Sequence, residues 1–385
     1  MIVNSLNTIS FHGQPLAESQ GEQPDALRRL LAAWQQGTTF RAVSQAPWIE
    51  AGEGEQHIEC TTCGSSGLPK VIRRHRLSWQ RTFEINRQLF NLTSLDRSAV
   101  FGGLNHSLSL YGVCESLGLG VPVEVMAGMR PRNQVRLLAD VGVTVLYITP
   151  TQLRLLTSSG DVLPKIRLIL CGGGKLDRKT RQRATECFPE AAIHEFYGAS
   201  ETSFITLADQ QTPEGSVGKA YPGVTIEIRH AHQGIGEVWV SSPYLFRGYS
   251  LGGSSETRSD GDFMTVGELG WLDELGYLWL AGRRSRMVTI ADQNVFPEAV
   301  ETLISQRLEQ GAVAVIACPD AQRGHLLHAF IQGESDPQLE KQLRSDITRQ
   351  LGSAMVPRHF HFLAEFPLLN GGKADLQRLT ALLNP

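Results

Sequence analysis

The middle of the chain alternates short apolar runs with segments of helical spacing, a pattern typical of strands that are each followed by a helix. Buried strands are predicted at 143–148, 166–170 and 192–196. Helices are predicted at 134–140, from 150 onward and at 177–187. Strands that alternate with helices predict a large α/β domain with a mostly parallel sheet.

Two later regions have a different pattern. Residues 215–282 contain short strands separated by turns, which predicts a small β-rich subdomain. The last hundred or so residues follow the order helix, strand, strand, helix, strand, which predicts a small α+β unit. We therefore predict an N-terminal domain at 1–283 and a small mobile C-terminal domain at 284–385.

Composition excludes several classes of protein. The 385 residues carry 36 basic and 39 acidic side chains, a net charge of −3, so the basic balance of a nucleic-acid binder is missing. Hydrophobic residues make up 41%, yet no apolar run approaches the roughly 18 residues that span a membrane. The 6 cysteines are scattered, and residues 1–14 do not resemble a secretory signal, so we predict reduced thiols and a cytoplasmic location.

The strongest local signal is the segment TTCGSSGLPK at 61–70. Its hydroxyls, glycines and lysine suit the wrapping of phosphate oxygens, although the spacing is not that of a Walker loop. An ordinary surface turn is the alternative for this segment taken alone. The Cys60-x-x-Cys63 pair has no second pair, so we predict two structural thiols there instead of a metal site.

Two further glycine-containing turns follow predicted strands. CGGGKL at 171–176 comes directly after one strand, and YGASE at 197–201 follows the next. The carboxyl ends of parallel strands meet at one edge of a sheet, where ligands bind in α/β proteins. We therefore predict a ligand site at this edge.

These segments, with three more, resemble the motifs of the adenylate-forming superfamily, and they occur in that family's order. The superfamily contains acyl- and aryl-CoA synthetases, acyl-carrier-protein ligases, peptide-synthetase adenylation domains and luciferases. The three other segments are GELGWLD at 267–273 leading to Gly282-Arg283, NVFPEAVE at 294–301 and NGGKAD at 370–375. The resemblance extends from about residue 57 to about residue 380.

The resemblance implies a role for each matching residue. The β- and γ-phosphates of ATP would be held by Thr62, Gly64, Ser65, Ser66, Gly67 and Lys70. The adenine would be enclosed by Gly172, Gly173, Gly174, Lys175 and Tyr197, with Gly198 in the same nucleotide site. Ser200 would bind the α-phosphate, and Glu201 would bind Mg²⁺. Glu268 and Arg283 would bind the ribose. Lys373 would reach the substrate carboxylate and the α-phosphate, so the implied catalytic residues are Lys373, Glu201 and Lys70.

The implied activity is that of an ATP-dependent carboxylic acid–thiol ligase. The carboxylate of a small acid attacks the α-phosphorus of ATP, pyrophosphate leaves, and the acyl-AMP passes its acyl group to a thiol. Positive groups around the transferring phosphate would stabilise the negative charge that develops there. The implied acceptor is CoA or the phosphopantetheine of an acyl carrier protein. The C-terminal domain would rotate about a hinge near Ser285 between the two steps.

One segment bears on the acid. Residues 104–112 resemble the Phe-His-x-x-Gly stretch of acyl- and aryl-CoA ligases and contain His106. Relatives that activate amino acids place an aspartate near this histidine, but no carboxylate lies between Phe101 and Val113. We predict an aromatic or medium-length acyl acid, with His106 lining its pocket. A purely structural histidine is the alternative.

Two other functions stay open. The chain could be a catalytically idle relative that binds a nucleotide or acyl ligand, or an adenylating enzyme that passes the acyl group to an amine. Less chain precedes the phosphate segment than the family usually carries, and we hypothesise that a homodimer covers the surface this leaves exposed. Ala291-Asp292 replaces a glycine pair near the family's pantetheine tunnel, so the choice of acceptor stays open as well.

Overall fold

A computed structural model describes the chain in seven stretches. They are residues 8–63, 69–232, 234–290, 293–308, 311–320, 322–368 and 374–383. The chain divides into two compact units. Unit 1 consists of Met1–Glu227, Trp239–Val266 and Asp273–Leu278, and unit 2 of Ile228–Val238, Gly267–Leu272 and Trp279–Pro385. The predicted domain boundary at residue 284 stays a prediction.

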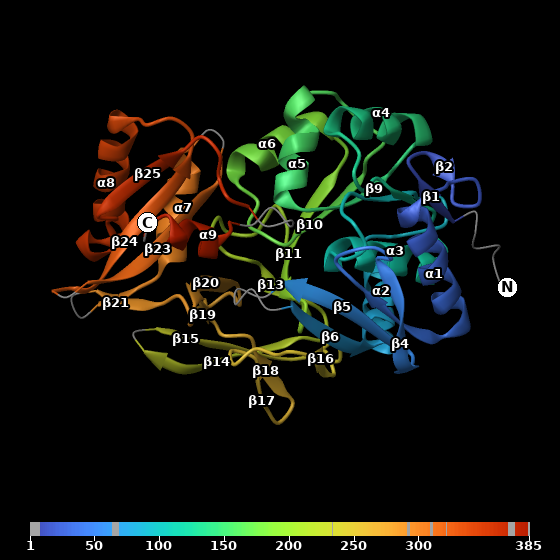
Figure 1. The fold of residues 1–385 in the computed structure, drawn as a ribbon, viewed down its shortest axis with the longest axis horizontal. Coiled ribbons are helices and arrows are strands. Elements are labelled where there is room, and N and C mark those ends of the chain that lie inside the picture. Colours follow the sequence, from blue (N-terminus) through green and yellow to red (C-terminus); the bar gives the residue numbers. More distant parts are fainter. Residues whose placement is uncertain are drawn as a thin grey trace. The chain divides into compact units, whose positions relative to one another are not determined.

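A nine-stranded sheet forms the centre of unit 1 (Figure 1). In spatial order its strands are β13 (Lys219–Ala220), β12 (Ser203–Ala208), β11 (Ala192–Ala199), β10 (Leu168–Gly172), β9 (Val145–Ile148), β7 (Ser98–Val100), β8 (Val123–Val125), β1 (Ile9–Phe11) and β2 (Gln14–Pro15). The pairs from β11 through to β1 are parallel, and antiparallel strands occur only at the two ends of this sheet. The predicted mostly parallel α/β sheet is confirmed.

Helices cover both faces of this sheet because its strands are apolar on both sides. The helices of unit 1 are α1 (Glu22–Gln36), α2 (Arg76–Leu89), α3 (Ser107–Leu119), α4 (Pro131–Val141), α5 (Pro150–Leu156) and α6 (Arg178–Cys187). Val145 and Tyr147 of β9 pack in one cluster with α1, α2 and α3. Leu146 and Ile148 pack on the opposite face with α4, α5 and α6. The period-2 alternation of a strand produces this division.

Local signals in the sequence set the helix ends around these strands. Thr149 caps α5 in a reciprocal capping box with Gln152, and Pro150 occupies the first turn. Asp177 accepts a hydrogen bond from the backbone N–H of Thr180 at the start of α6. Gly142 ends α4 in the left-handed conformation.

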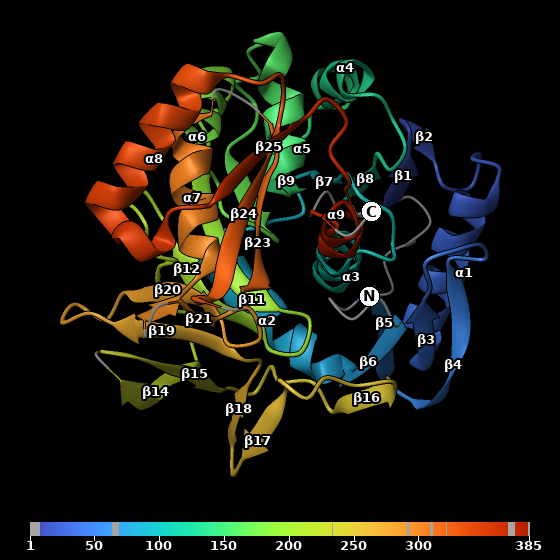
Figure 2. The ribbon, with the colours of Figure 1, turned by 60° about the vertical axis from the view of Figure 1, so that its left-hand side comes forward.

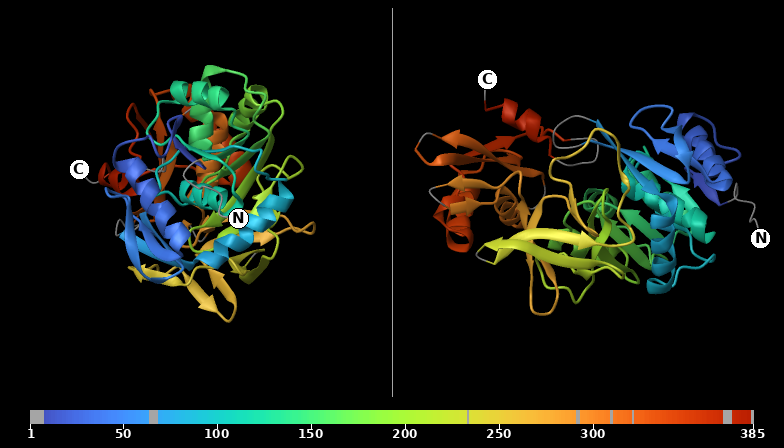
Figure 3. Two further views of the ribbon diagram at one scale, coloured as in Figure 1. Left: turned by 90° about the vertical axis from the view of Figure 1, so that its right-hand side faces the viewer. Right: turned by 90° about the horizontal axis from the view of Figure 1, so that it is seen from below.

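A second sheet of unit 1 carries the predicted phosphate segment. Its order is β16 (Gly248–Leu251), β6 (Pro69–His75), β5 (His57–Cys63), β3 (Thr38–Ala42) and β4 (Ile49–Glu55). Helix α1 lies beside β3 and β4, as the blue elements of Figure 3 show. Because β6 pairs with both β5 and β16, it links the phosphate segment to residues near position 250.

The predicted β-rich region forms a six-stranded sheet. Its strands are β17 (Arg258–Asp260), β18 (Phe263–Thr265), β15 (Ile235–Ser241), β19 (Glu268–Leu272) and β20 (Leu278–Arg283), with β14 (Thr225–His232) paired to β15.

The chain from Val288 onward belongs to unit 2 and forms a small α+β structure. Its elements are β21 (Val288–Ile290), β22 (Gln293–Val295), α7 (Pro297–Arg307), β23 (Val313–Asp320), β24 (Gly324–Gln332), α8 (Pro337–Leu351), β25 (His359–Leu363) and α9 (Leu376–Ala381). Helices α7 and α8 pack on one face of the β23–β24–β25 sheet, and α9 packs on the other (Figure 2). The predicted order of helices and strands is confirmed. No helix in the described stretches has the length and apolarity needed to cross a membrane.

Candidate active site

The predicted turns lie together at one edge of the parallel sheet. Strands β7, β9, β10 and β11 are parallel neighbours, so the residues after their carboxyl ends share that edge. Gly172 pairs with Phe196 in the β10–β11 register, which brings the glycine turn beside the segment that begins at Tyr197. His106 follows β7 at the same edge of the sheet, at the start of α3.

The turn Gly172–Gly174 needs its glycines. A Cβ at Gly172 would overlap the ring of Phe196, and Gly173 has a φ of +89°, which favours glycine. Glu195 on β11 accepts a hydrogen bond of 3.0 Å from the backbone N–H of Leu176 and forms an ion pair with Arg181. The turn is therefore fixed to the neighbouring strand, with Gly173, Gly174 and Lys175 exposed beyond it.

The segment from Tyr197 to Ser203 turns sharply between β11 and β12. A Cβ at Gly198 would overlap the carbonyl oxygen of Ser203, so the approach of the two strands requires glycine. Ser203 itself has a φ of +60°, a strained conformation for a residue with a side chain. We call residues Ser200–Ser203 the Glu201 corner. It presents Ser200 and Glu201, both half-buried, at the edge of the sheet.

Ser200 contacts a polar group from the start of α3. The hydroxyls of Ser200 and Ser107 lie 2.9 Å apart, and Cys60 Sγ lies 3.7 Å from the Ser107 hydroxyl. Burial raises the pKa of the Cys60 thiol, which suits a structural role. Burial lowers the pKa of His106, which precedes Ser107, so the neutral imidazole is favoured at this edge.

Glu201 keeps part of its carboxylate available. Its Oε1 accepts a hydrogen bond of 2.7 Å from the hydroxyl of Tyr249, and among the described residues no donor reaches Oε2. In the part of the chain that the structure describes, no three His, Cys, Asp or Glu side chains are arranged to hold a metal ion. A single carboxylate with an available oxygen fits an Mg²⁺ ion that is held mainly by nucleotide phosphates.

The two described ends of the phosphate segment belong to the paired strands β5 and β6. Thr62 pairs with Lys70 in the backbone register, and Lys70 is half-buried. Gly64, Ser65, Ser66 and Gly67 lie outside the described residues, and so does the side chain of Thr62.

Unit 2 holds the predicted ribose-binding pair. Arg283 Nε lies 3.0 Å from Glu268 Oε1, and Glu268 is 8% exposed. The two residues are therefore together within their own unit. Lys373 and the Ala291-Asp292 pair lie outside the described residues.

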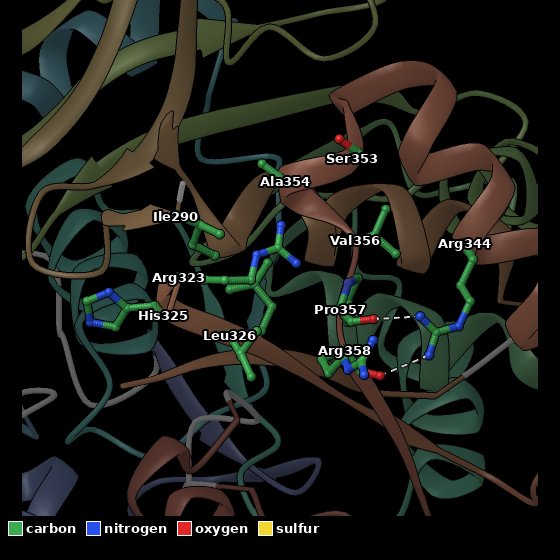
Figure 4. Close-up of a pocket in the computed structure, with 11 residues that line it drawn as sticks. Ile290, Arg323, His325, Leu326, Arg344, Ser353, Ala354, Val356, Pro357 and Arg358 are labelled. Carbon is green, nitrogen blue, oxygen red and sulfur yellow. Dashed lines mark hydrogen bonds between the residues drawn. The ribbon is translucent and has the colours of Figure 1, made fainter. Parts of the chain in front are cut away.

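A small cationic pocket is present in unit 2 (Figure 4). Its volume is about 130 Å³, and the described residues that line it include Arg323, His325, Arg344 and Arg358 but no acid. Arg344 donates hydrogen bonds of 2.8 and 3.0 Å to the carbonyls of Pro357 and Arg358, which fixes one wall. Arg323 and Arg358 are exposed.

Three residues that hold these turns were not predicted from the sequence. Arg74, Tyr249 and Glu195 all contact the edge, yet none belongs to a recognised segment. The available signal for Arg74 was its period-2 spacing from buried Ile72 within β6, which places both side chains on one face. No comparable signal marked Tyr249 or Glu195.

Comparison with known proteins agrees with this architecture. A family model described as AMP-binding enzyme matches residues 43–250, and one described as AMP-binding enzyme C-terminal domain matches residues 299–373. An uncharacterized acyl–CoA ligase of Bacillus subtilis, YhfT, is 29% identical over 83% of this chain and 67% of its own length. A putative long chain fatty acid-CoA ligase of Staphylococcus epidermidis, VraA, is 31% identical over 77% of this chain and 64% of its own length. The chain thus spans about two thirds of the length of these relatives.

Solved structures show the same fold at lower identity. The amide bond synthetase McbA from Marinactinospora thermotolerans superposes with a TM-score of 0.74 and 22% identity, over 88% of this chain and 72% of that one. The o-succinylbenzoate CoA synthetase MenE from Bacillus subtilis, in complex with the acyl-adenylate OSB-AMP, superposes with a TM-score of 0.74 and 21% identity. The superposition covers 88% of this chain and 72% of that one.

Proposed function

Because the chain belongs to the family of AMP-binding enzymes, we propose that it is an ATP-dependent carboxylic acid–thiol ligase that works through an acyl-AMP. The observation that carries the proposal is the meeting of the glycine turn and the Glu201 corner at the ends of β10 and β11. These two features offer backbone groups, a hydroxyl and a carboxylate at the one edge where α/β sheets bind nucleotides.

Each predicted residue keeps its proposed role. Tyr197 and the glycine turn would enclose the adenine, and Glu268 with Arg283 would bind the ribose. Ser200 would donate to the α-phosphate, and Glu201 would hold Mg²⁺ through its available oxygen. Bound there, Mg²⁺ would offset negative charge on the phosphates. The Thr62–Lys70 segment would hold the β- and γ-phosphates.

In the proposed first step, an oxygen of the substrate carboxylate forms a bond to the α-phosphorus. The bond between the α-phosphorus and the oxygen that bridges to the β-phosphorus breaks at the same time. Pyrophosphate leaves with the electron pair of that bond. Lys70 would attract the leaving phosphates, and Lys373 would orient the attacking carboxylate. The positioning of the two reactants supplies much of the acceleration.

For the acid we propose an aromatic or medium-length acyl group. The support is the segment between Phe101 and Val113, which contains His106 but no carboxylate that could pair with the ammonium group of an amino acid. The names of relatives point to similar acids, since one is a putative long chain fatty acid-CoA ligase and another a 2-succinylbenzoate–CoA ligase.

For the acceptor we propose CoA or a carrier-protein phosphopantetheine, both of which carry phosphate. The cationic pocket of unit 2 supports a phosphate-bearing acceptor because exposed Arg323 and Arg358 line it without a compensating acid. The alternative of transfer to an amine is favoured by one observation, the fold shared with an amide bond synthetase. An idle nucleotide-binding relative is the remaining alternative.

We propose that 284–385 moves as a lid about Ser285. The arginines on either side of this residue are anchored separately. Arg284 lies 3.4 Å from Glu237 on β15, whereas Arg286 pairs with Glu301 on α7 at 2.6 Å. A rotation at Ser285 would leave both anchors intact. The homodimer and the cytoplasmic location stay predictions, and light scattering at micromolar concentration tests the former.

Acid-dependent exchange of labelled pyrophosphate into ATP tests the proposed first step. We expect one class of acids to support exchange in the full chain, and expect Lys373→Ala and Glu201→Ala to lose it. If no acid in a broad panel supports exchange while ATP still binds, the idle alternative is correct. Mass spectrometry of products formed with CoA, a carrier protein or amines then identifies the acceptor.

A further inference from the structure

Two residues outside every recognised motif hold the Glu201 corner, and they come from the neighbouring strands β6 and β16. One is Arg74, which is 1% exposed on β6. Its guanidinium donates to the carbonyl oxygen of Ser200, to the Ser203 hydroxyl at 2.6 Å and to the carbonyl oxygen of Tyr244 at 3.1 Å. Its Cζ lies 5.1 Å from the centre of the Trp79 ring. A buried arginine whose donors are aimed at backbone oxygens fixes the path of the chain that carries them.

The other residue is Tyr249 on β16. Its hydroxyl donates to Glu201 Oε1 at 2.7 Å and lies 2.9 Å from the hydroxyl of Thr257. Thr257 can donate to the tyrosine oxygen, so the tyrosine proton is left to point at the carboxylate. This contact selects the orientation of the carboxylate and leaves Oε2 facing away from the tyrosine.

Both residues depend on the same strand. Arg74 belongs to β6, and Tyr249 pairs with Ile72 of β6 in the antiparallel register with β16. The backbone N–H of Phe246 also donates to the Glu201 carbonyl oxygen at 2.8 Å. Lys70, one of the proposed phosphate-binding residues, also belongs to β6, so one strand carries Lys70 and supports the Glu201 corner.

The corner needs such support because its backbone is strained. Ser203 has a φ of +60°, and residues in this conformation persist only where the surroundings hold them. The Arg74 contacts end on both sides of the turn, at Ser200 and at Ser203. Without them, the turn would have no side-chain donor to hold its first carbonyl among the described residues.

We propose that Tyr249 and Arg74 are positioning residues that hold the carboxylate of Glu201 and the hydroxyl of Ser200 ready for the metal–nucleotide complex. The inference rests on the proposed function, in which Glu201 binds the metal. Hydrogen bonds to a ligating carboxylate commonly alter metal affinity by about 10- to 100-fold when they are removed. The hydroxyl of Tyr249 is therefore expected to affect metal binding without contacting the metal.

The decisive experiment measures Mn²⁺ binding by electron paramagnetic resonance, with the full chain and α,β-methylene-ATP. Tyr249→Phe removes only the hydroxyl, and Tyr221→Phe is the matched control. Tyr221 is a buried tyrosine of unit 1, whereas Tyr249 is half-buried, and the Tyr221 hydroxyl donates to Asn86 at 2.7 Å, away from the corner. We expect Tyr249→Phe to weaken Mn²⁺ binding about 10-fold and Tyr221→Phe to leave it within about twofold.

Enzyme kinetics separates positioning from a loss of folded protein. We expect excess Mg²⁺ to restore the exchange rate of Tyr249→Phe but not that of Glu201→Gln, because only the latter removes the negatively charged carboxylate that would bind the metal. Arg74→Lys keeps the charge and loses the planar fork of donors. We expect it to lower kcat about 10-fold while KM for ATP changes little.

The outcomes distinguish this inference from the proposed function. If Glu201→Gln weakens Mn²⁺ binding but Tyr249→Phe does not, the positioning inference is wrong and the proposed function stands. If Glu201→Gln has no effect on Mn²⁺ binding, both are overturned. A Tyr221→Phe variant that loses as much Mn²⁺ affinity as Tyr249→Phe would also overturn the inference.

Discussion

Unit 1 contains two glutamates whose surroundings contrast, one in the core and one at the edge of the sheet. Glu115 on α3 is 1% exposed, and its carboxylate accepts three side-chain hydrogen bonds. The donors are Asn86, Tyr111 and Tyr147. Burial nevertheless raises the pKa of Glu115 to about 7. Glu201 is half-buried and accepts one side-chain hydrogen bond, from Tyr249.

This difference shows that a shifted pKa does not by itself locate the site in this fold. Shifted values often mark functional groups, but a carboxylate enclosed in a core shifts for the same reason, the loss of water. Glu115 has no oxygen left for a ligand, because its two oxygens accept all three bonds. Glu201 keeps an oxygen for a ligand and lies at the edge where the neighbouring parallel strands end. We therefore expect Glu115 to affect stability and Glu201 to affect chemistry.

The largest expected effect is on stability in Glu115→Ala. The substitution removes the buried acceptor of Tyr147, Tyr111 and Asn86; the last two keep a second partner, and a group left unsatisfied costs about 1–3 kcal/mol in addition to the loss of packing in the core. We expect the free energy of unfolding in urea to fall by about 3 kcal/mol or more. Glu201→Ala, made at the half-buried corner, should change it by less than about 1 kcal/mol. Equal losses in the two variants would contradict the comparison.

A smaller effect is expected on the pH dependence of stability in Glu115→Gln. In the unfolded chain the carboxyl loses its proton near the ordinary pKa of 4.5, whereas in the folded chain it keeps the proton until about pH 7. The folded state then binds more protons, so stability falls as pH rises between these values. Glutamine does not titrate, and urea midpoints from pH 5 to pH 8 should therefore fall less steeply in the variant. Parallel curves for the two proteins would show that Glu115 has an ordinary pKa.

Part of this contrast could be predicted from the sequence. The β-branched runs before residues 148 and 170 predicted strands because a strand buried on both faces needs apolar side chains at successive positions. The position of the glycine turn and of the Glu201 corner at one edge of the sheet was predicted as well, because neighbouring parallel strands end at the same edge. The core position of Glu115 was not predicted, because its donors come from two helices and a strand.

The contacts that Arg74 and Tyr249 make with the Glu201 corner could not be predicted from the sequence, for a related physical reason. Arg74 and Ser200 are separated by 126 positions, and their contact depends on how two sheets pack. Tyr249 reaches Glu201 only in the observed β6–β16 register. A period-2 pattern indicates which face a side chain occupies, but it contains no information about which distant strand lies opposite.

A third prediction sharpens the comparison at the edge itself. In Gly172→Ala the added methyl would overlap the Phe196 ring, which must move together with the start of the Tyr197 segment. Since this turn would enclose the adenine, we expect AMP binding measured by calorimetry to weaken about 10-fold, equivalent to about 1.4 kcal/mol. Urea unfolding serves as the control for folded protein. Unchanged AMP affinity would place the nucleotide elsewhere.

The smallest effect on stability is expected in unit 2, where Glu268 combines features of both glutamates. It is buried like Glu115, yet its partner Arg283 has a side chain that is 50% exposed. Solvent screens such a pair, and pairs of this kind contribute at most about 1 kcal/mol. Glu268→Gln keeps an oxygen that can accept from Arg283 Nε, so we expect the free energy of unfolding to change by less than about 1 kcal/mol. If the pair binds the ribose, AMP affinity should still fall several-fold. A large loss of stability with unchanged AMP affinity would instead place Glu268 with Glu115, among the carboxylates that serve the fold.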